Sequence, residues 1–263
     1  AEVVALAKAE GSARGATVFV TLEPCAHWGK TPPCVDALIA AGVARVVCAG
    51  PDPGKIAGGG ARKLRRAGIA VEFGLEADAA RELNAAFYFA HESPRRPWVT
   101  LKLALSADGA VARKGRKRAK ITGASADREV HRMRAQSDAI AVGIGTALAD
   151  DPALTVRHVR APRVAPVRVV FDRDCRLPAN SALAGSAERI PTVVLAERRG
   201  AAREFSLFRK GVEVLRTRNL KHALQVLAGH EVRSLFVEGG PTLAKALLTA
   251  RLVDRLVIFQ SPR

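Results

Sequence analysis

Short β-branched runs alternate with helix-length segments along almost the whole of this 263-residue chain, and this alternation restricts the possible folds most strongly. Runs such as 17–22 and 45–49 have the length and composition of buried strands. Between them lie segments, such as 34–41, whose apolar residues recur at helical spacing. This order is typical of layered α/β domains with mostly parallel strands. We therefore expect an α/β fold.

The alternation is interrupted once, at Ser93-Pro94-Arg95-Arg96-Pro97, where two prolines three residues apart fix φ and remove backbone donors. This break predicts two α/β domains, 1–91 and 98–263, joined by a linker at 92–97. In the first domain we expect helices at 2–9, 34–41, 61–67 and 77–89 and strands at 17–22, 45–49 and 69–73. In the second we expect strands at 98–105, 139–143, 167–171, 192–195, 235–237 and 255–259, and helices at 125–136, 220–228 and 241–250.

The charge balance indicates an acidic partner, since 42 Lys+Arg against 25 Asp+Glu give a net charge of +17. Nucleic acid, a membrane surface and a phosphorylated small molecule all satisfy this condition. Aromatic residues make up only 5%, which disfavours base stacking on nucleic acid. No apolar run reaches the roughly 20 residues that a membrane span needs. With four cysteines and no signal-peptide pattern, the sequence predicts a soluble cytoplasmic protein without a membrane partner.

Cys25 follows the first strand and Cys34 stands at a helix start, where unpaired N–H groups favour a thiolate. Alone, the pair is equally consistent with zinc ligands and with two unrelated buried cysteines. Zinc nucleobase deaminases combine Pro-Cys…Cys with a helical His-x-Glu, whose glutamate transfers protons and is not a ligand. Glu2 fits that role, although a solvated carboxylate in a first helical turn is the alternative.

Residues 21–34, Thr-Leu-Glu-Pro-Cys-Ala-His-Trp-Gly-Lys-Thr-Pro-Pro-Cys, resemble the deaminase half of the bifunctional riboflavin-biosynthesis deaminase/reductase family. The long gap between the cysteines distinguishes it from transfer-RNA and cytidine deaminases, which have Cys-x-x-Cys. The resemblance implies a cytidine-deaminase-like three-layer domain in which Cys25 and Cys34 bind Zn²⁺ and Glu2 is catalytic. The third ligand is a histidine expected just before Ala1, so this domain is expected to lack its first strands. We interpret His27 as a loop residue that faces the substrate, with a substitute ligand as the alternative.

The second half has no Gly-x-Gly-x-x-Gly after its first strand, so a dinucleotide site there must be built differently. The segment 236–243, Phe-Val-Glu-Gly-Gly-Pro-Thr-Leu, places glycines between a strand and a helix start. Glycines permit close backbone approach, and free N–H groups at a helix start bind phosphate. The segment is therefore a candidate pyrophosphate site, with a structural turn as the alternative.

Four blocks in order, 102–109, 134–140, 145–157 and 238–243, resemble the reductase half of the same family. The resemblance implies a dihydrofolate-reductase-like α/β domain that uses NADPH. The implied cofactor positions are Ala104, Thr146, Asp150, Gly240, Pro241, Thr242, Leu243, Ala244, Lys245 and Ala246. The implied substrate positions are Arg134, Leu154, Arg157 and Glu238. The two arginines are suited to gripping a sugar phosphate, because a guanidinium presents a fixed fork of donors.

The sequence departs from the family in two places. Arg118-Ala119-Lys120 stands where the family has Ser-x-Trp, so cations replace a substrate hydroxyl and a cofactor-packing indole. Arg118 and Lys120 are therefore additional candidates for the substrate and cofactor sites. The chain also stops after the strand at 255–259, which the family follows with further strands, so the second domain is expected to be incomplete.

Together these resemblances predict a bifunctional enzyme of riboflavin biosynthesis. The first domain would deaminate 2,5-diamino-6-ribosylamino-4(3H)-pyrimidinone 5′-phosphate by hydrolysis. The second would reduce the ribosyl group to ribityl with NADPH. We expect a homo-oligomer that acts on this phosphorylated pyrimidine. The alternatives are a deaminase of another nucleotide or of tRNA, a degenerate non-catalytic homologue, and a basic nucleic-acid binder.

Overall fold

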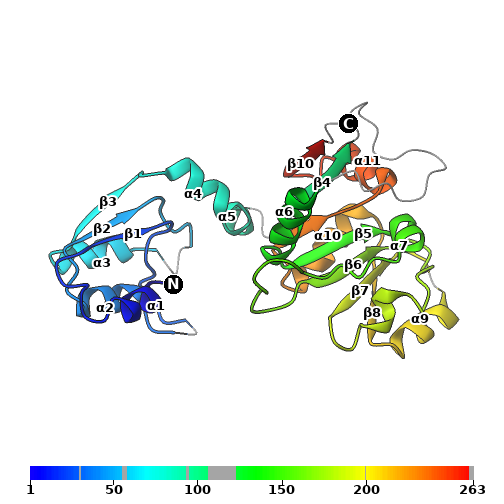
Figure 1. The fold of residues 1–263 in the computed structure, drawn as a ribbon, viewed down its shortest axis with the longest axis horizontal. Helices are drawn as coiled ribbons and strands as arrows, with labels where there is room; N and C mark the ends of the chain where they lie inside the picture. The colour runs from blue at the N-terminus through cyan, green and yellow to red at the C-terminus, as the bar shows by residue number, and fades with distance from the viewer. Residues whose placement is uncertain (30, 55–57, 93–94, 106–122, 199, 261–263) are drawn as a thin grey trace. The chain divides into compact units, whose positions relative to one another are not determined.

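The computed structural model describes residues 1–29, 31–54, 58–92, 95–105, 123–198 and 200–260, and the chain divides into two compact units, Ala1–Glu92 and Ser93–Arg263. Both units are α/β with parallel strands, which confirms the fold class expected from the alternation (Figure 1). Arg118 and Lys120 lie outside the described residues.

The first unit is built on a three-stranded parallel sheet in the order β1-β2-β3. The strands are β1 (Thr17–Val20), β2 (Arg45–Cys48) and β3 (Ala70–Phe73). The helices are α1 (Glu2–Lys8), α2 (Cys34–Ala40), α3 (Gly60–Arg66), α4 (Ala77–Leu83) and α5 (Ala85–Glu92). The register pairs Val18 with Val46 and Val46 with Val71, so alternate residues of the three strands face the same side.

Strand alternation divides the apolar residues of this sheet between two helical layers. On one face Val46 and Cys48 are fully buried against α2 and α3, with Leu38 and Leu64 in the same core cluster. On the other face Val47 lines a cavity of about 300 Å³ together with residues of β1 and α4. The first unit therefore has three layers, which are α2 with α3, the sheet, and α4.

The second unit is built on a seven-stranded sheet in the order β10-β4-β9-β5-β6-β7-β8, in which every described pairing is parallel. The strands are β4 (Trp98–Leu105), β5 (Ala139–Gly143), β6 (Val167–Phe171), β7 (Thr192–Ala196), β8 (Val212–Arg216), β9 (Ser234–Val237) and β10 (Arg255–Gln260). The helices are α6 (Ala124–Ala135), α7 (Ile144–Asp150), α8 (Ala182–Gly185), α9 (Ala201–Phe208), α10 (Leu220–Gly229) and α11 (Pro241–Thr249).

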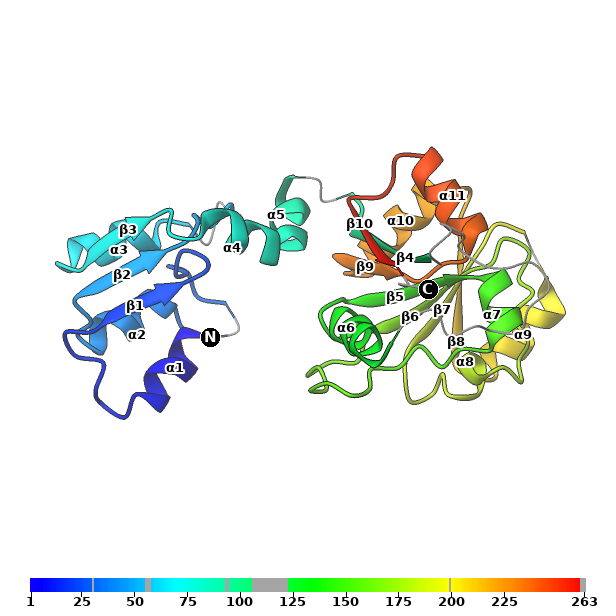
Figure 2. The same cartoon turned by 45° about the horizontal axis from the view of Figure 1, so that its top comes forward.

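Helices cover both faces of this sheet, as a parallel sheet requires (Figure 2). α10 and α11 pack on one face in a cluster that includes Leu101 and Val169. α6, α7, α8 and α9 pack on the other face in a cluster that includes Ile140 and Val170. The adjacent residues of β5 and β6 thus point into different cores.

The order of the strands determines where a ligand can bind. β9 lies between β4 and β5, although it follows them by many residues in the chain, so the direction of strand addition reverses here. In open parallel sheets, ligands bind at the carboxyl ends of strands at such a reversal. Gly143 ends β5 and Glu238 directly follows β9, and the Glu238 N–H continues the ladder to Ala141 O at 2.8 Å.

Several elements differ from the sequence-based expectation. The helix expected at 77–89 is two helices, because Asn84 ends α4 and its side-chain amide donates to Ala80 O at 2.9 Å. α7, α8, α9 and β8 were not expected. α7 begins directly at the end of β5 and contains Gly145, which masks its helical pattern. In α9, Phe205 and Phe208 are exposed, so the apolar pattern does not mark the buried face.

Candidate active sites

Three sequence-predicted residues of the first unit meet at the start of two helices. Glu2 opens α1 and Cys34 opens α2, while Cys25 lies in the loop after β1. The Cys34 N–H donates to Cys25 Sγ at 3.3 Å, and the Cys34 thiol hydrogen-bonds with the side chains of Glu2 and Cys25. Burial first, and then these two neighbours, raise the pKa of the Cys34 thiol to about 12.

This cluster has the chemistry of an incomplete zinc site. Two sulfur ligands beside a carboxylate suit a divalent cation, which would stabilise both thiolates. Among the residues that the structure describes, no group of three His, Cys, Asp or Glu side chains is placed to hold a metal ion. The His27 ring does not complete such a group, and its buried Nδ1 has no hydrogen-bond partner. Cys25 and Cys34 therefore fit two of the ligands that a zinc ion requires.

Glu23, just before the first cysteine, holds the cysteine loop in place, a role the sequence reasoning did not assign. Its carboxylate is 8% exposed and accepts N–H groups from Ala61 at 2.8 Å and Asp52 at 3.4 Å. It thereby ties the end of β1 to the start of α3 and to the loop after β2. Gly60 lets the two segments approach, since a Cβ there would lie 1.8 Å from Pro24 O.

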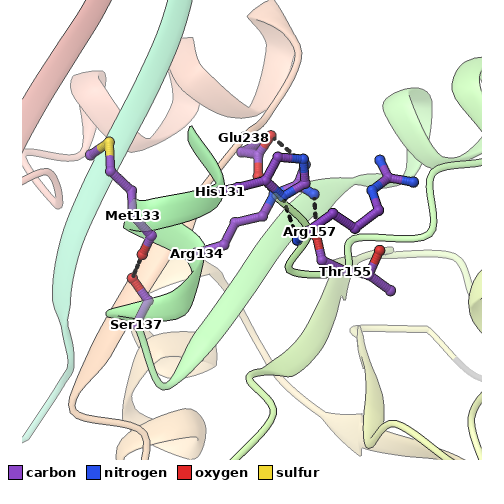
Figure 3. Close-up of polar contacts among 7 residues, drawn as sticks. All are labelled: His131, Met133, Arg134, Ser137, Thr155, Arg157 and Glu238. Carbon is purple, nitrogen blue, oxygen red and sulfur yellow. Dashed lines mark hydrogen bonds and ion pairs between the residues drawn. The ribbon is translucent and has the colours of Figure 1, made fainter. Parts of the chain in front are cut away.

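In the second unit, Arg134 of α6 forms a two-pronged ion pair with Glu238 (Figure 3). Arg134 Nε donates to Glu238 Oε1 at 2.5 Å and Nη2 donates to Oε2 at 2.9 Å. Nη1 donates to Thr155 O at 2.8 Å. Three of the five guanidinium N–H groups are thus used within the protein, and both side chains are nearly nine-tenths buried. Arg134 therefore orients Glu238, and its charge is balanced within the protein.

Arg157 is the exposed cation of this site. Its backbone N–H donates to Nδ1 of the buried His131 at 3.0 Å. Its guanidinium makes no ion pair with a residue of the described part of the chain, and in Figure 3 no dashed contact from the other residues drawn reaches it. Leu154, predicted to contact substrate, is 4% exposed and its side chain packs in the core. His131 was not predicted, because a lone histidine within a helix gives no functional signal.

The glycine segment after β9 meets α7 at one point. Gly240 N donates to Thr146 Oγ1 at 3.0 Å, which joins two of the predicted cofactor positions. A Cβ on Gly240 would lie 2.9 Å from the same oxygen, and one on Gly239 would lie 3.1 Å from the Leu243 side chain. The backbone is therefore open only because both residues are glycine, which fits a group that approaches it closely.

The remaining predicted cofactor positions are distributed around this segment. Leu243 and Ala244 are buried in the core, so only their backbone could face a cofactor. Pro241, Thr242 and Lys245 are exposed, and Ala246 is half-buried on α11. Ala104 is half-buried near the carboxyl end of β4, and Asp150 is half-buried at the end of α7.

Comparisons with known proteins find matches for both units of the chain. A family model described as "RibD C-terminal domain" matches residues 97–263. A second, "Cytidine and deoxycytidylate deaminase zinc-binding region", matches residues 1–50. The riboflavin biosynthesis protein RibD of Aquifex aeolicus is 41% identical over 266 residues, covering 100% of this chain and 74% of that protein. The RibD protein of Escherichia coli is 40% identical over 287 residues, covering 100% of this chain and 75% of that protein.

Solved structures give the same result for the fold. Acinetobacter baumannii RibD superposes with a TM-score of 0.82 at 38% identity, covering 100% of this chain and 73% of that chain. A diaminohydroxyphosphoribosylaminopyrimidine deaminase/5-amino-6-(5-phosphoribosylamino)uracil reductase from Thermotoga maritima superposes with a TM-score of 0.82 at 32% identity, with the same coverages.

The fold and the two sites define a two-unit α/β enzyme, with a deaminase-type unit followed by a reductase-type unit. The chain belongs to the RibD family of riboflavin biosynthesis proteins. This confirms the family resemblance and the biosynthetic role predicted from the sequence. In the described part of the chain, no helix is both long and apolar enough to cross a membrane.

Proposed function

We propose that the first unit deaminates 2,5-diamino-6-ribosylamino-4(3H)-pyrimidinone 5′-phosphate, and that the second unit reduces the ribosyl group of the product with NADPH. The observation that carries the proposal is the Arg134–Glu238 ion pair at the carboxyl end of β9, with Arg157, which pairs with no acidic residue among those described, on the neighbouring segment. This arrangement offers an oriented carboxylate for a ribose hydroxyl and a cation for its phosphate.

For the deaminase, we propose Cys25 and Cys34 as two zinc ligands, with a histidine directly before Ala1 as the third. Bound zinc would lower the pKa of a water molecule so that it can attack the pyrimidine carbon. The Glu2 carboxylate lies beside Cys34. It would take a proton from the attacking water and deliver it to the departing amine, so that the C–N bond breaks and ammonia leaves.

For the reductase, we propose that the N–H groups at the start of α11 and the glycine backbone at 239–240 bind the pyrophosphate of NADPH. Bound NADPH supplies the hydride. Thr146 holds the glycine segment through the Gly240 N–H, and Ala104 and Asp150 lie at the ends of neighbouring elements. Arg118 and Lys120 remain proposals from the sequence alone.

The substrate interactions follow from the charges. Arg157 provides an exposed guanidinium for the phosphate, whereas the charge of Arg134 is already balanced by Glu238. Each Glu238 oxygen accepts one hydrogen bond from Arg134, which leaves lone pairs for a sugar hydroxyl. We propose that Glu238 accepts a ribose hydroxyl while Arg157 binds the phosphate, so the sugar is held at both ends.

The test supplies each reaction with its own substrate and identifies the products by mass spectrometry. The proposal predicts ammonia release in the first reaction, in a chain that carries a histidine before Ala1. It predicts NADPH oxidation and a product heavier by two hydrogens in the second. A folded protein that binds nucleic acid in a salt-dependent manner but converts neither substrate would instead be a non-catalytic homologue.

We also propose that the chain forms a homo-oligomer. Light scattering of the purified protein tests this, because a monomeric mass at micromolar concentration would contradict it.

A further inference from the structure

α6 holds the segment 154–158 at two points that lie three residues apart on one face of the helix. His131 Nδ1 accepts the Arg157 N–H at 3.0 Å, and Arg134 Nη1 donates to Thr155 O at 2.8 Å. Figure 3 shows both contacts reaching from the same side of α6 to the same stretch of backbone. α6 therefore fixes this segment at two backbone groups, the Thr155 carbonyl and the Arg157 N–H.

The segment needs such support because its backbone is strained. Leu154 has φ +48° and His158 has φ +62°, both in the left-handed region that non-glycine residues rarely adopt. Strained residues persist only where their surroundings over-determine them. Burial of Leu154 anchors one end, and the His131 hydrogen bond anchors the backbone of Arg157 near the other.

We propose that His131 is a positioning residue for the reductase, which fixes the backbone of Arg157 and thus the direction of its guanidinium toward the substrate phosphate. The proposal rests on the proposed reductase function and adds a residue to it. His131 is 6% exposed, so it acts through Arg157 and does not touch the substrate. Without this hydrogen bond the strained segment would relax, and the Arg157 guanidinium would move away from the phosphate.

The hydrogen bond requires a neutral imidazole with its proton on Nε2, because Nδ1 accepts. The groups that face it are Arg134 on α6, Arg157 and His158 on the held segment, and Glu238 after β9. Burial, followed by Arg134, Arg157 and His158, lowers the pKa of His131 below its ordinary value, and Glu238 opposes this. Protonation at acid pH would place an N–H on Nδ1 opposite the Arg157 N–H and break the contact.

The first experiment compares His131→Leu with His131→Asn, whose side-chain oxygen can replace Nδ1 as the acceptor. The exposed His230, which directly follows α10, supplies the matched controls, His230→Leu and His230→Asn. We expect His131→Leu to raise KM for 5-amino-6-(5-phosphoribosylamino)uracil by about 5-fold, the value of one hydrogen bond, with KM for NADPH unchanged. His131→Asn should recover most of the loss. Equal KM values in His131→Leu and wild type, or equal impairment in both variants, would overturn the proposal.

The second experiment follows KM for the same substrate as the pH falls below 6.5. The substrate phosphate titrates in wild type and variant alike, so only the difference between them reports on His131. We expect KM to rise more steeply in wild type than in His131→Asn, which cannot be protonated. Identical pH profiles of KM in wild type and His131→Asn would overturn the proposal. This comparison does not depend on whether His131→Leu folds.

Amide hydrogen exchange separates this inference from the proposed function. The Arg157 amide should exchange faster in His131→Leu than in wild type, and should stay protected in His131→Asn, whether or not the protein turns over substrate. A wild-type protein that does not oxidise NADPH would refute the function, whereas unchanged exchange at Arg157 would refute the role of His131.

Discussion

Arg134 and Arg157 are both predicted substrate residues, but of these two only the Arg134 guanidinium forms an ion pair with a described residue, so their substitutions should have different effects. Arg157→Ala removes an exposed charge-assisted contact with the phosphate. Substrate binding should weaken by about 1.5 kcal/mol, so KM for the phosphorylated substrate should rise roughly tenfold without loss of stability. Arg134→Ala leaves the buried Glu238 carboxylate unpaired, which should cost about 3 kcal/mol of unfolding free energy as well as activity. Steady-state kinetics and thermal unfolding of both variants test this. Equal effects on KM with no change in stability would contradict it.

Substitutions of Glu2 and of the two cysteines should also have different effects on zinc binding and activity. In a chain with a histidine before Ala1, Glu2→Gln should keep zinc but lower deamination by roughly 10²- to 10⁴-fold, because an amide cannot carry the proton. Cys25→Ser should lose zinc together with activity. The 263-residue chain itself should hold zinc weakly, since the described residues supply two ligands. Metal analysis after dialysis against a chelator is the measurement, and stoichiometric zinc in the unextended chain would contradict the assignment.

At the scale of elements, the junction of α7 with the start of α11 is the proposed cofactor site. Gly240→Ala places a methyl group 2.9 Å from Thr146 Oγ1, the oxygen that accepts the Gly240 N–H. The helices must then separate, so KM for NADPH should rise at least several-fold while KM for the substrate changes little. Gly229→Ala is the matched control, because a Cβ there meets nothing within 4 Å. Unchanged cofactor KM in Gly240→Ala would remove this junction from the site.

The sequence predicts the elements that carry strong local patterns and the residues that belong to motifs. Alternation around β1, β2, β5 and β6 is enough to predict the α/β class, and the family motif at 21–34 predicts Cys25 and Cys34 as zinc ligands. It does not predict contacts made by the fold. Arg134 and Glu238 are 104 positions apart, and only the insertion of β9 beside β5 brings them together. His131 and Glu23 act through backbone N–H groups, for which a sequence contains no pattern.

At the scale of the whole molecule, the two units have separate cores, so damage to one should spare the chemistry of the other. Gly60→Ala would place a Cβ 1.8 Å from Pro24 O and should disrupt the cysteine loop. We expect loss of deamination and faster proteolysis within residues 1–92, with NADPH oxidation retained. Parallel loss of both activities would show that the units depend on each other.

The central claim is that the second unit reduces a phosphorylated ribosylaminopyrimidine at the site formed by Glu238 and Arg157. The most direct measurement incubates the 263-residue protein with 5-amino-6-(5-phosphoribosylamino)uracil and NADPH, and quantifies both products. We predict NADP⁺ and the ribityl product in equal amounts, with a much lower rate at low substrate concentration in Arg157→Ala. A folded wild-type protein that oxidises no NADPH, or an Arg157→Ala variant with wild-type kinetics, would contradict the account.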